Sequence, residues 1–429
     1  MLKEISVKDE KKLREWLDER SQEIDPEVVA KAAEILNRVR KEGDAALVDL
    51  TQKFDGVTMQ DFRVSEAEMD EAEAECDESF KEAMCLAAEN IRTFHKAQLP
   101  QSYLLQQDNG IYLGERVIPL SSVGIYVPGG RAQYPSSVLM NAIPASVAGV
   151  KRIVMVTPPN KEGTINPNIA YAARLAGITE IYKVGGAQAI GALAYGTQSI
   201  PAVDKITGPG NIFVAAAKKL VFGKVDIDMI AGPSEILVIA DEGADPSFVA
   251  ADLLSQAEHD PLASAILLTT SRSLLEEVNQ ELEKQCAVLP KKEIAQASIR
   301  DYGRSIVCDS ISECIDFANA IAPEHLELCI GDPMAYLSGV QNAGSVFLGY
   351  YTCESICDYF GGTNHVLPTN GTARFSSALG VDAFVKKSCF LHYSREAVIQ
   401  YGHYIETMAE EEQLQAHANA VTVRLRNGK

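Results

Sequence analysis

Two short segments of the sequence combine side chains that bind metals and transfer protons. In the first, residues 250–260, Gln256 and His259 lie three residues apart. Apolar Leu253 and Leu254 at helical spacing predict an amphipathic helix, which would place the amide and the imidazole on one face. Such a pair at a helix end suits a metal ion or a substrate. The alternative is a surface helix whose Gln and His face water.

The second segment is Glu324-His325, within Ala322-Pro-Glu-His-Leu-Glu. Histidine titrates near neutral pH and suits a general base, and a neighbouring glutamate can steer water. If the segment is helical, the two side chains point roughly 100° apart, so one substrate could meet each on a different side. The alternative is a His and a Glu that cap a helix end.

Asp358, His365 and His417 are further candidates. A site of Gln, His and Asp side chains is rich in oxygen and nitrogen and has no thiolate, which is compatible with Zn²⁺ in an open site. Spacing does not join ligands that lie so far apart in the chain. The sequence has neither an H-E-x-x-H metal motif nor a G-x-S-x-G hydrolase motif.

Alternating strands and helices must position these candidates. From about Val117, short apolar segments alternate with helical patterns, which predicts parallel βα units whose ligands bind at the carboxyl ends of the strands. The expected strands are 123–127, 152–156, 180–184, 235–240, 265–269, 305–308, 326–330 and 345–348. The expected helices include 169–176, 212–221, 274–286 and 314–320, with a break between two α/β regions near residues 231–234.

Gly-rich turns follow Tyr126, begin at Gly185 and span Gly208-Pro-Gly-Asn211. None matches the dinucleotide G-x-G-x-x-G motif or the phosphate-binding loop motif. Glycines there would let backbone amides approach a phosphate, and three such turns make a nucleotide site plausible. The alternative for each is a tight left-handed turn between a strand and a helix.

The two ends of the chain are acidic and carry helical patterns. Apolar spacing over 28–39 and a capping box of Ser65 and Glu68 predict helices up to about His95. Residues 397–423 predict a long helical segment after the last α/β strand. Packing is the expected role of the first hundred residues.

The composition and net charge of the chain limit the kinds of molecule that we expect it to bind. The 429 residues carry a net charge of −20, which argues against nucleic acid or anionic membrane and favours a cationic substrate. Nine cysteines without a C-x-x-C pair, and an N-terminus without an apolar signal region, predict a cytoplasmic protein. Cys353 and Cys357 could share a helix face, and reduced core thiols are the alternative to a functional pair.

Eight motifs, spread in order along the chain, resemble those of the histidinol dehydrogenase family. They are Gly124-Ile-Tyr-Val-Pro-Gly-Gly130, Val184-Gly-Gly-Ala-Gln-Ala-Ile190, Asp204-Lys-Ile-Thr-Gly-Pro-Gly-Asn211, Asp228-Met-Ile-Ala-Gly-Pro-Ser-Glu235, Leu254-Ser-Gln-Ala-Glu-His259, Pro323-Glu-His-Leu326, Ala343-Gly-Ser-Val-Phe-Leu-Gly349 and Gly362-Thr-Asn-His-Val-Leu-Pro368. The resemblance covers nearly the whole length, and the set is far more specific than any single motif.

The resemblance implies an α/β fold of two incomplete Rossmann-like (aldehyde-dehydrogenase-like) domains plus a small helical C-terminal tail, in an intertwined homodimer with shared active sites. The expected first domain comprises residues 1–108 and 237–384 and carries the metal and catalytic residues. The second, 109–236, binds NAD, and the tail, 385–429, completes the dimer and the active site.

The implied activity is an NAD-dependent, four-electron oxidation of L-histidinol to L-histidine through the aldehyde, the last steps of histidine biosynthesis. Carried over by motif, Glu324 and His325 match the catalytic pair. One Zn²⁺ per subunit is expected on Gln256, His259, Asp358 and His417, which also contact substrate. Ser234 and Glu412 match further substrate contacts, and Tyr126, Gln188 and Asn211 match NAD contacts.

Two rival functions remain at this stage. A zinc-dependent relative could oxidise a different alcohol with the same catalytic pair. A zinc hydrolase with Glu324 activating water would form its product without NAD, although the three Gly-rich turns count against it.

Overall fold

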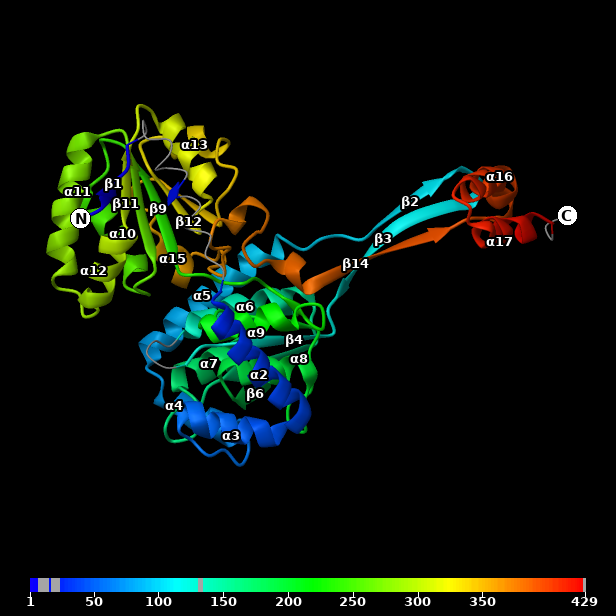
Figure 1. The fold of residues 1–429 in the computed structure, drawn as a ribbon, viewed down its shortest axis with the longest axis horizontal. Coiled ribbons are helices and arrows are strands. Elements are labelled where there is room, and N and C mark those ends of the chain that lie inside the picture. Colours follow the sequence, from blue (N-terminus) through cyan, green and yellow to red (C-terminus); the bar gives the residue numbers. More distant parts are fainter. Residues whose placement is uncertain (7–14, 17–23, 130–133, 427–429) are drawn as a thin grey trace. The chain divides into compact units, whose positions relative to one another are not determined.

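The computed structural model describes residues 1–6, 15–16, 24–129 and 134–426, which form two compact units (Figure 1). The first unit comprises Met1–Gln98 and Ser121–Phe384 and contains two parallel sheets. The second comprises Leu99–Leu120 and Val385–Lys429. Part of the expected turn after Tyr126, residues 130–133, lies outside the described residues.

A six-stranded parallel sheet has the order β1-β11-β10-β9-β12-β13. Its strands are β1 (Lys3–Glu4), β9 (Glu235–Ala240), β10 (Ser264–Thr269), β11 (Arg304–Val307), β12 (His325–Cys329) and β13 (Ser345–Leu348). The apolar run in β9 is buried on both faces, as parallel strands require. Ile236 and Val238 share a core with α10 (Pro246–Ala257), α11 (Arg272–Cys286) and α12 (Lys292–Asp301). Leu237 and Ile239 pack with α13 (Ile311–Ile321) on the opposite face.

A five-stranded parallel sheet has the order β6-β5-β4-β7-β8. Its strands are β4 (Ser122–Tyr126), β5 (Arg152–Thr157), β6 (Glu180–Lys183), β7 (Lys205–Thr207) and β8 (Asp226–Ile227), and its helices are α6 (Pro135–Ala148), α7 (Pro167–Leu175), α8 (Gly186–Tyr195) and α9 (Ile212–Val221). The chain runs outward from β4 to β6 and then returns to place β7 on the other side of β4. Ligands of such sheets bind where the strand order reverses.

From residue 24 to residue 100 the helices are α2 (Pro26–Glu42), α3 (Asp44–Asp55), α4 (Glu66–Glu75) and α5 (Glu78–Lys96). Leu36 of α2 and Leu47 of α3 share a buried core with Tyr126 and Val154 of the five-stranded sheet. Half of the expected capping box is confirmed: Ser65 Oγ accepts a hydrogen bond from the backbone N–H of Glu68 at 3.2 Å, but the Glu68 carboxylate pairs with Lys183 at 2.9 Å. The domain boundaries at residues 108, 236 and 384 stay a prediction.

The second unit is an antiparallel sheet in the order β14-β3-β2, followed by two helices. Its elements are β2 (Tyr103–Gln107), β3 (Ile111–Pro119), β14 (Val385–His392), α16 (Arg395–Glu411) and α17 (Gln415–Arg426). The long helical segment expected over 397–423 is present, divided into two helices. The chain breaks at Gln413, whose φ is 58°, and folds back so that Gly402 lies against Val421 and Leu425. This close approach lets α17 pack along α16.

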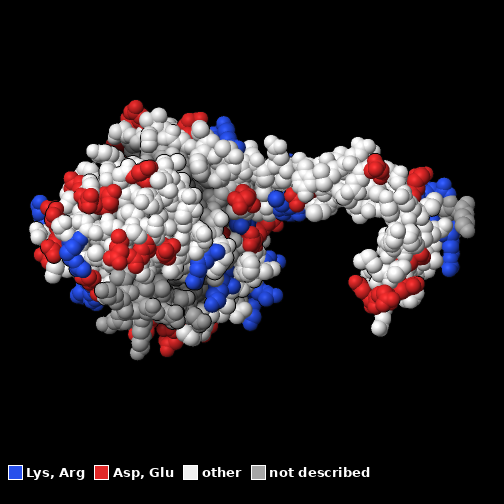
Figure 2. All heavy atoms as spheres, turned by 90° about the horizontal axis from the view of Figure 1, so that it is seen from above, with Lys and Arg blue, Asp and Glu red and all other residues white. Residues whose placement is uncertain are grey.

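The fold class is confirmed: parallel α/β sheets with a helical C-terminal region. The strands β9 and β13 and the helix α9 have the expected bounds. The strands of the second unit were not expected. All nine cysteines are free. Among the described helices, none combines the length and apolar character needed to cross a bilayer. Figure 2 shows acidic side chains spread over the face in view, with basic side chains in smaller groups, consistent with the net charge of −20.

Candidate functional site

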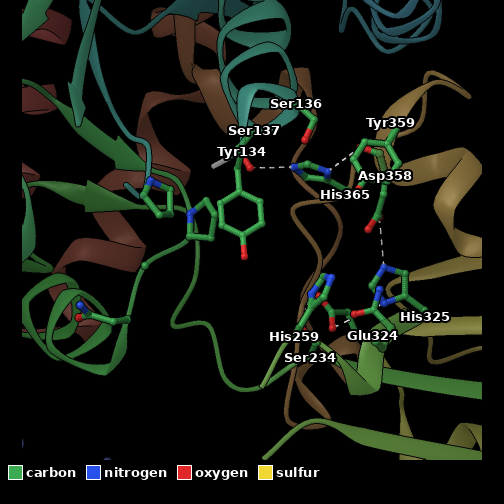
Figure 3. A pocket seen from close by; sticks show the side chains of 15 residues that line it. Tyr134, Ser136, Ser137, Ser234, His259, Glu324, His325, Asp358, Tyr359 and His365 are labelled. Atoms are coloured by element: carbon green, nitrogen blue, oxygen red, sulfur yellow. Dashed lines mark hydrogen bonds and ion pairs between the residues drawn. The ribbon is translucent and has the colours of Figure 1, made fainter. Parts of the chain in front are cut away.

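A cavity of about 310 Å³ in the first unit brings together most of the predicted site residues (Figure 3). Those that line it are Asn211, Ser234, Gln256, His259, Glu324, His325 and Asp358. They come from both parallel sheets, although more than 140 positions separate Asn211 from Asp358. The fold therefore joins side chains that sequence spacing could not.

Adjacent strands β9 and β12 hold the Glu324–His325 pair. His325 is the first residue of β12 and lies opposite Ile236 of β9. The helical geometry considered for this pair is therefore wrong, and so is the alternative of a helix cap. Glu324 Oε2 accepts a hydrogen bond from the backbone N–H of Glu235 at 2.9 Å. His325 Nδ1 lies 3.0 Å from the backbone oxygen of Glu235.

This backbone contact sets the tautomer of His325. A carbonyl oxygen only accepts, so Nδ1 carries the proton and donates it, and Nε2 keeps a free lone pair in the neutral ring. Nε2 lies 3.6 Å from Asp358 Oδ1, and neither atom has a hydrogen-bond partner among the described residues. The ring also stacks on Phe347, with centroids 6.0 Å apart. His325 thus presents a base whose orientation is fixed on two sides.

Burial and charge act in opposite directions on this group of residues. Burial alone lowers the pKa of His325, but the carboxylates of Glu324 and Asp358 outweigh it, and the pKa is raised well above its ordinary value. Burial raises the pKa of Glu324, and His325 offsets this only in part. Burial also acts to raise the pKa of Asp358, but its electrostatic interaction with His325 lowers it overall. An ionised Asp358 therefore faces an imidazole that readily holds a proton.

The residues predicted to bind metal offer oxygen and nitrogen atoms to the same cavity. The helix expected over 250–260 ends at Ala257, so Gln256 lies in the last turn of α10 and His259 lies just past its end. Gln256 Nε2 donates to Glu354 Oε1 at 3.1 Å, which fixes the amide. Ser234 Oγ lies 3.5 Å from His259 Nδ1.

These donors suit a divalent metal ion such as zinc. The described residues contain no cluster of three His, Cys, Asp or Glu side chains arranged for a metal, so the amide of Gln256 would have to contribute. The buried, unpartnered Oδ1 of Asp358 is an acceptor that a cation would satisfy. Oxygen and nitrogen ligands without thiolate are compatible with an open zinc site.

Glu412 and His417 belong to the second unit. Glu412 caps the end of α16, and His417 lies in the first turn of α17, where its backbone N–H donates to the oxygen of Leu414 at 2.9 Å. Both side chains are exposed in that unit. Their roles in binding zinc and substrate stay predictions.

The three residues predicted to contact NAD line a second cavity of about 590 Å³. Tyr126 ends β4, Gln188 lies in the first turn of α8, and Asn211 caps α9, so all three lie near the point where the strand order reverses. Tyr126 Oη accepts a hydrogen bond from the backbone N–H of Gly186 at 3.1 Å. Asn211 borders both cavities, which makes it the meeting point of the two sites.

A buried ion pair holds the turn before Asn211. Lys218 and Asp228, with side chains 3% and 1% exposed, are in direct contact. Asp228 Oδ2 accepts from the backbone N–H of Gly208 at 2.7 Å, and Lys218 Nζ donates to the Gly208 oxygen at 3.0 Å. Gly208 has a φ of 113° and packs against the backbone of Tyr126, so a side chain there would clash. The pair thus holds both the backbone N–H and the backbone oxygen of Gly208.

Three residues of this region were given no role from the sequence. His365, considered but given no role, donates from Nδ1 to the Asp358 backbone oxygen at 2.9 Å, and its Nε2 lies 3.2 Å from Ser137 Oγ. Glu354 orients Gln256, and Asp55 lines the second cavity. His365 lies in one of the family motifs, whereas no local pattern marks the other two.

Comparisons with known proteins agree with these motifs. The sequence profile described as histidinol dehydrogenase matches residues 18–425. A histidinol dehydrogenase of Halalkalibacterium halodurans is 55% identical over 91% of this chain and 92% of its own length. That of Clostridium acetobutylicum is 52% identical over 97% of both chains. The crystal structure of histidinol dehydrogenase from Elizabethkingia anophelis matches with a TM-score of 0.95 and 43% identity, covering 99% of this chain and 98% of that one. With matches that span its two parallel sheets and its C-terminal helices, the chain belongs to the histidinol dehydrogenase family.

Proposed function

We propose that this protein oxidises L-histidinol to L-histidine through L-histidinaldehyde, with two molecules of NAD⁺ as electron acceptors, in the last steps of histidine biosynthesis. The observation that supports this most directly is the backbone-fixed His325 beside Glu324 in a cavity that meets the second cavity at Asn211. Asn211 borders a cavity that contains a base and a second cavity large enough for a nucleotide, and this arrangement suits hydride transfer from an alcohol.

His325 acts as the base in both oxidations. Its Nε2 accepts the proton of the substrate hydroxyl while the carbon releases its hydride, so the alcohol loses two electrons and two hydrogens. Glu324 then accepts a proton from water as the water adds to the aldehyde, and protonated His325 returns its proton to the aldehyde oxygen, so the hydrate forms and His325 is neutral again. His325 takes a proton from this hydrate in the second oxidation, which yields the carboxylate.

Gln256, His259 and Asp358, together with His417, are the residues that would hold one zinc ion per subunit. When bound, zinc orients the imidazole and amine of the substrate, and NAD⁺ accepts the hydride. With Asp358 engaged by a cation, one of the two carboxylates that raise the pKa of His325 is neutralised. This leaves His325 better suited to accept a proton near neutral pH.

A thiol-dependent route to the acid is disfavoured. Burial raises the pKa values of the Cys353 and Cys357 thiols, the opposite of what a nucleophilic thiolate requires. Hydration of the aldehyde by Glu324 removes the need for a covalent thiohemiacetal.

NADH formation from histidinol, with and without a metal chelator, tests the proposal. We expect two NADH for each histidinol consumed, loss of activity with the chelator and recovery on adding zinc. Oxidation of another amino alcohol in preference to histidinol would contradict the proposed substrate, and product formation without NAD would favour a hydrolase.

A further inference from the structure

The second cavity contains a carboxyl group whose binding capacity the protein does not use. Asp55, the last residue of α3, lines this cavity together with Tyr126, Gln188 and Asn211. Its Oδ2 is buried and accepts no hydrogen bond from the described residues. A buried acceptor without a partner costs stability, so its presence calls for an explanation.

Three cationic side chains, Lys31, Arg38 and Lys53, line the cavity, and in the described residues no ion pair joins any of them to Asp55. The Arg38 guanidinium pairs with Glu42 at 3.0 Å and with Asp49 at 2.9 Å. Lys53 lies over the ring of Phe54, 5.3 Å from its centroid. Burial raises the pKa of Asp55 to about 6, as expected for a carboxyl group held without a compensating charge. At neutral pH it is still mostly ionised.

An ionised carboxylate only accepts hydrogen bonds, so the ligand it suits carries donors such as hydroxyl groups. The hydroxyls of a ribose have this chemistry, and acidic residues bind them in other dinucleotide sites. Because Asn211 borders both cavities, the reactive end of a dinucleotide would point toward His325. The adenosine half would then occupy the space lined by Asp55.

We propose that Asp55 binds the adenosine ribose hydroxyls of the dinucleotide and makes the site selective for NAD over NADP. This inference rests on the proposed dehydrogenase function. A 2′-phosphate in the same place would bring added negative charge against the carboxylate and would remove a hydroxyl donor. Asp55 is thus a specificity residue, and it takes no part in the proton transfers assigned to Glu324 and His325.

The test compares Asp55→Asn with Glu34→Gln. Glu34 is an exposed carboxylate that borders the same cavity and serves as a control for the general charge of the region. The kcat/KM for NAD and for NADP is measured with saturating histidinol. Binding of ADP-ribose and of its 2′-phosphate is measured by calorimetry on the zinc-loaded protein.

For Asp55→Asn we expect a fall of about 10-fold in kcat/KM for NAD, mostly through KM, since a charge-assisted hydrogen bond is weakened. The preference for NAD over NADP should fall by roughly 10-fold or more, and ADP-ribose should bind correspondingly more weakly. Glu34→Gln should change each quantity less than about twofold. Asp55→Ser replaces Asp55→Asn if the latter does not fold.

An unchanged NAD-to-NADP preference in the Asp55 variant would overturn the inference, and so would an equal change in both variants. The calorimetric binding measurements distinguish failure of this inference from failure of the proposed function. A parent protein that binds ADP-ribose through Asp55 but oxidises no histidinol would refute the function alone. A parent protein that does not bind ADP-ribose would refute the inference.

Discussion

His325 owes its proposed role to two contacts that fix its ring, a backbone hydrogen bond and stacking on Phe347, and to a second nitrogen that is left unpaired. Nδ1 is tied to the backbone of β9, and Nε2 faces Asp358 at 3.6 Å without a hydrogen bond. A base held in one tautomer does not have to reorient before it accepts a proton. The orientation comes from the backbone, so variants of nearby side chains should leave the tautomer intact.

We expect His325→Ala to lower NADH formation from histidinol by about 10²–10⁴-fold, the usual contribution of a positioned base. Zinc should remain bound, because His325 has no proposed ligand role. Initial rates and the zinc content of the purified variant measure the two effects. Loss of zinc together with activity would show that the assignment of roles is wrong.

Asp55 should make the stability of the ligand-free protein depend on pH. Its pKa of about 6 in the folded state lies above the value of about 3.9 for an unfolded chain. The folded state therefore binds this proton more tightly, and the stability that the proton contributes is lost as pH rises from about 4 through 6.

We therefore expect Asp55→Asn to raise the urea midpoint of the ligand-free protein at pH 8 and to have little effect at pH 4. The gain should develop between these values. Unfolding of parent and variant over this range measures it, and a variant less stable than the parent at pH 8 would show that Asp55 has a structural partner.

The residues of the first cavity show where sequence reasoning ends. The chemistry of Gln256, His259 and the Glu324–His325 pair was visible in the sequence, but their joining with Asp358 was available only from the family resemblance. Asp55 and Glu354 were missed because their roles depend on residues that only the fold brings close to them. Asp55 has an unpaired carboxylate oxygen, and Glu354 orients the amide of Gln256, and neither property has a sequence pattern.

The strands and helices of the parallel sheets were largely predictable. A strand that is buried on both faces, such as β9, has a continuous run of apolar residues that can be recognised in the sequence. The pattern failed where burial is weak. All five residues of β2 are exposed, so no alternation marks this strand. A helical pattern continues past Gln413, so the break between α16 and α17 was missed, because it depends on tertiary packing of the helix pair at Gly402.

The turn between β7 and α9 depends on the Lys218–Asp228 pair. We expect Lys218→Met to destabilise the protein by about 3–5 kcal/mol, because it leaves a buried carboxylate without its partner. It should also raise the KM for NAD, since the Gly208 oxygen loses its donor. Urea unfolding and steady-state kinetics measure the two effects.

Lys284→Met is the matched control. Lys284 pairs with Glu281 at 3.0 Å but is 75% exposed, so its loss should change stability by no more than about 0.5 kcal/mol. Lys218→Met/Asp228→Asn should recover part of the loss. Equal effects of the two lysine variants would show that the buried pair does not support the turn.

The proposed homodimer with shared active sites can be tested by subunit mixing. If His417 of one chain completes the zinc site of the other, mixing inactive His259→Ala and His417→Ala subunits creates one intact site in each heterodimer. Random exchange makes about half of the dimers heterodimers, so about a quarter of parental activity should return. No recovery, with exchange verified by mass spectrometry, would contradict the shared site.

The sheet of the second unit joins β3, which ends at Pro119, to β14, which begins at Val385. A ribosome adds about 5–20 residues per second, so synthesis of the intervening ~270 residues takes on the order of tens of seconds. During that time the edge of β3 that later pairs with β14 has no partner strand. An unpaired strand edge is a template for aggregation. The hairpin is therefore a segment that a ribosome-associated chaperone would have to shield until the last tenth of the chain emerges.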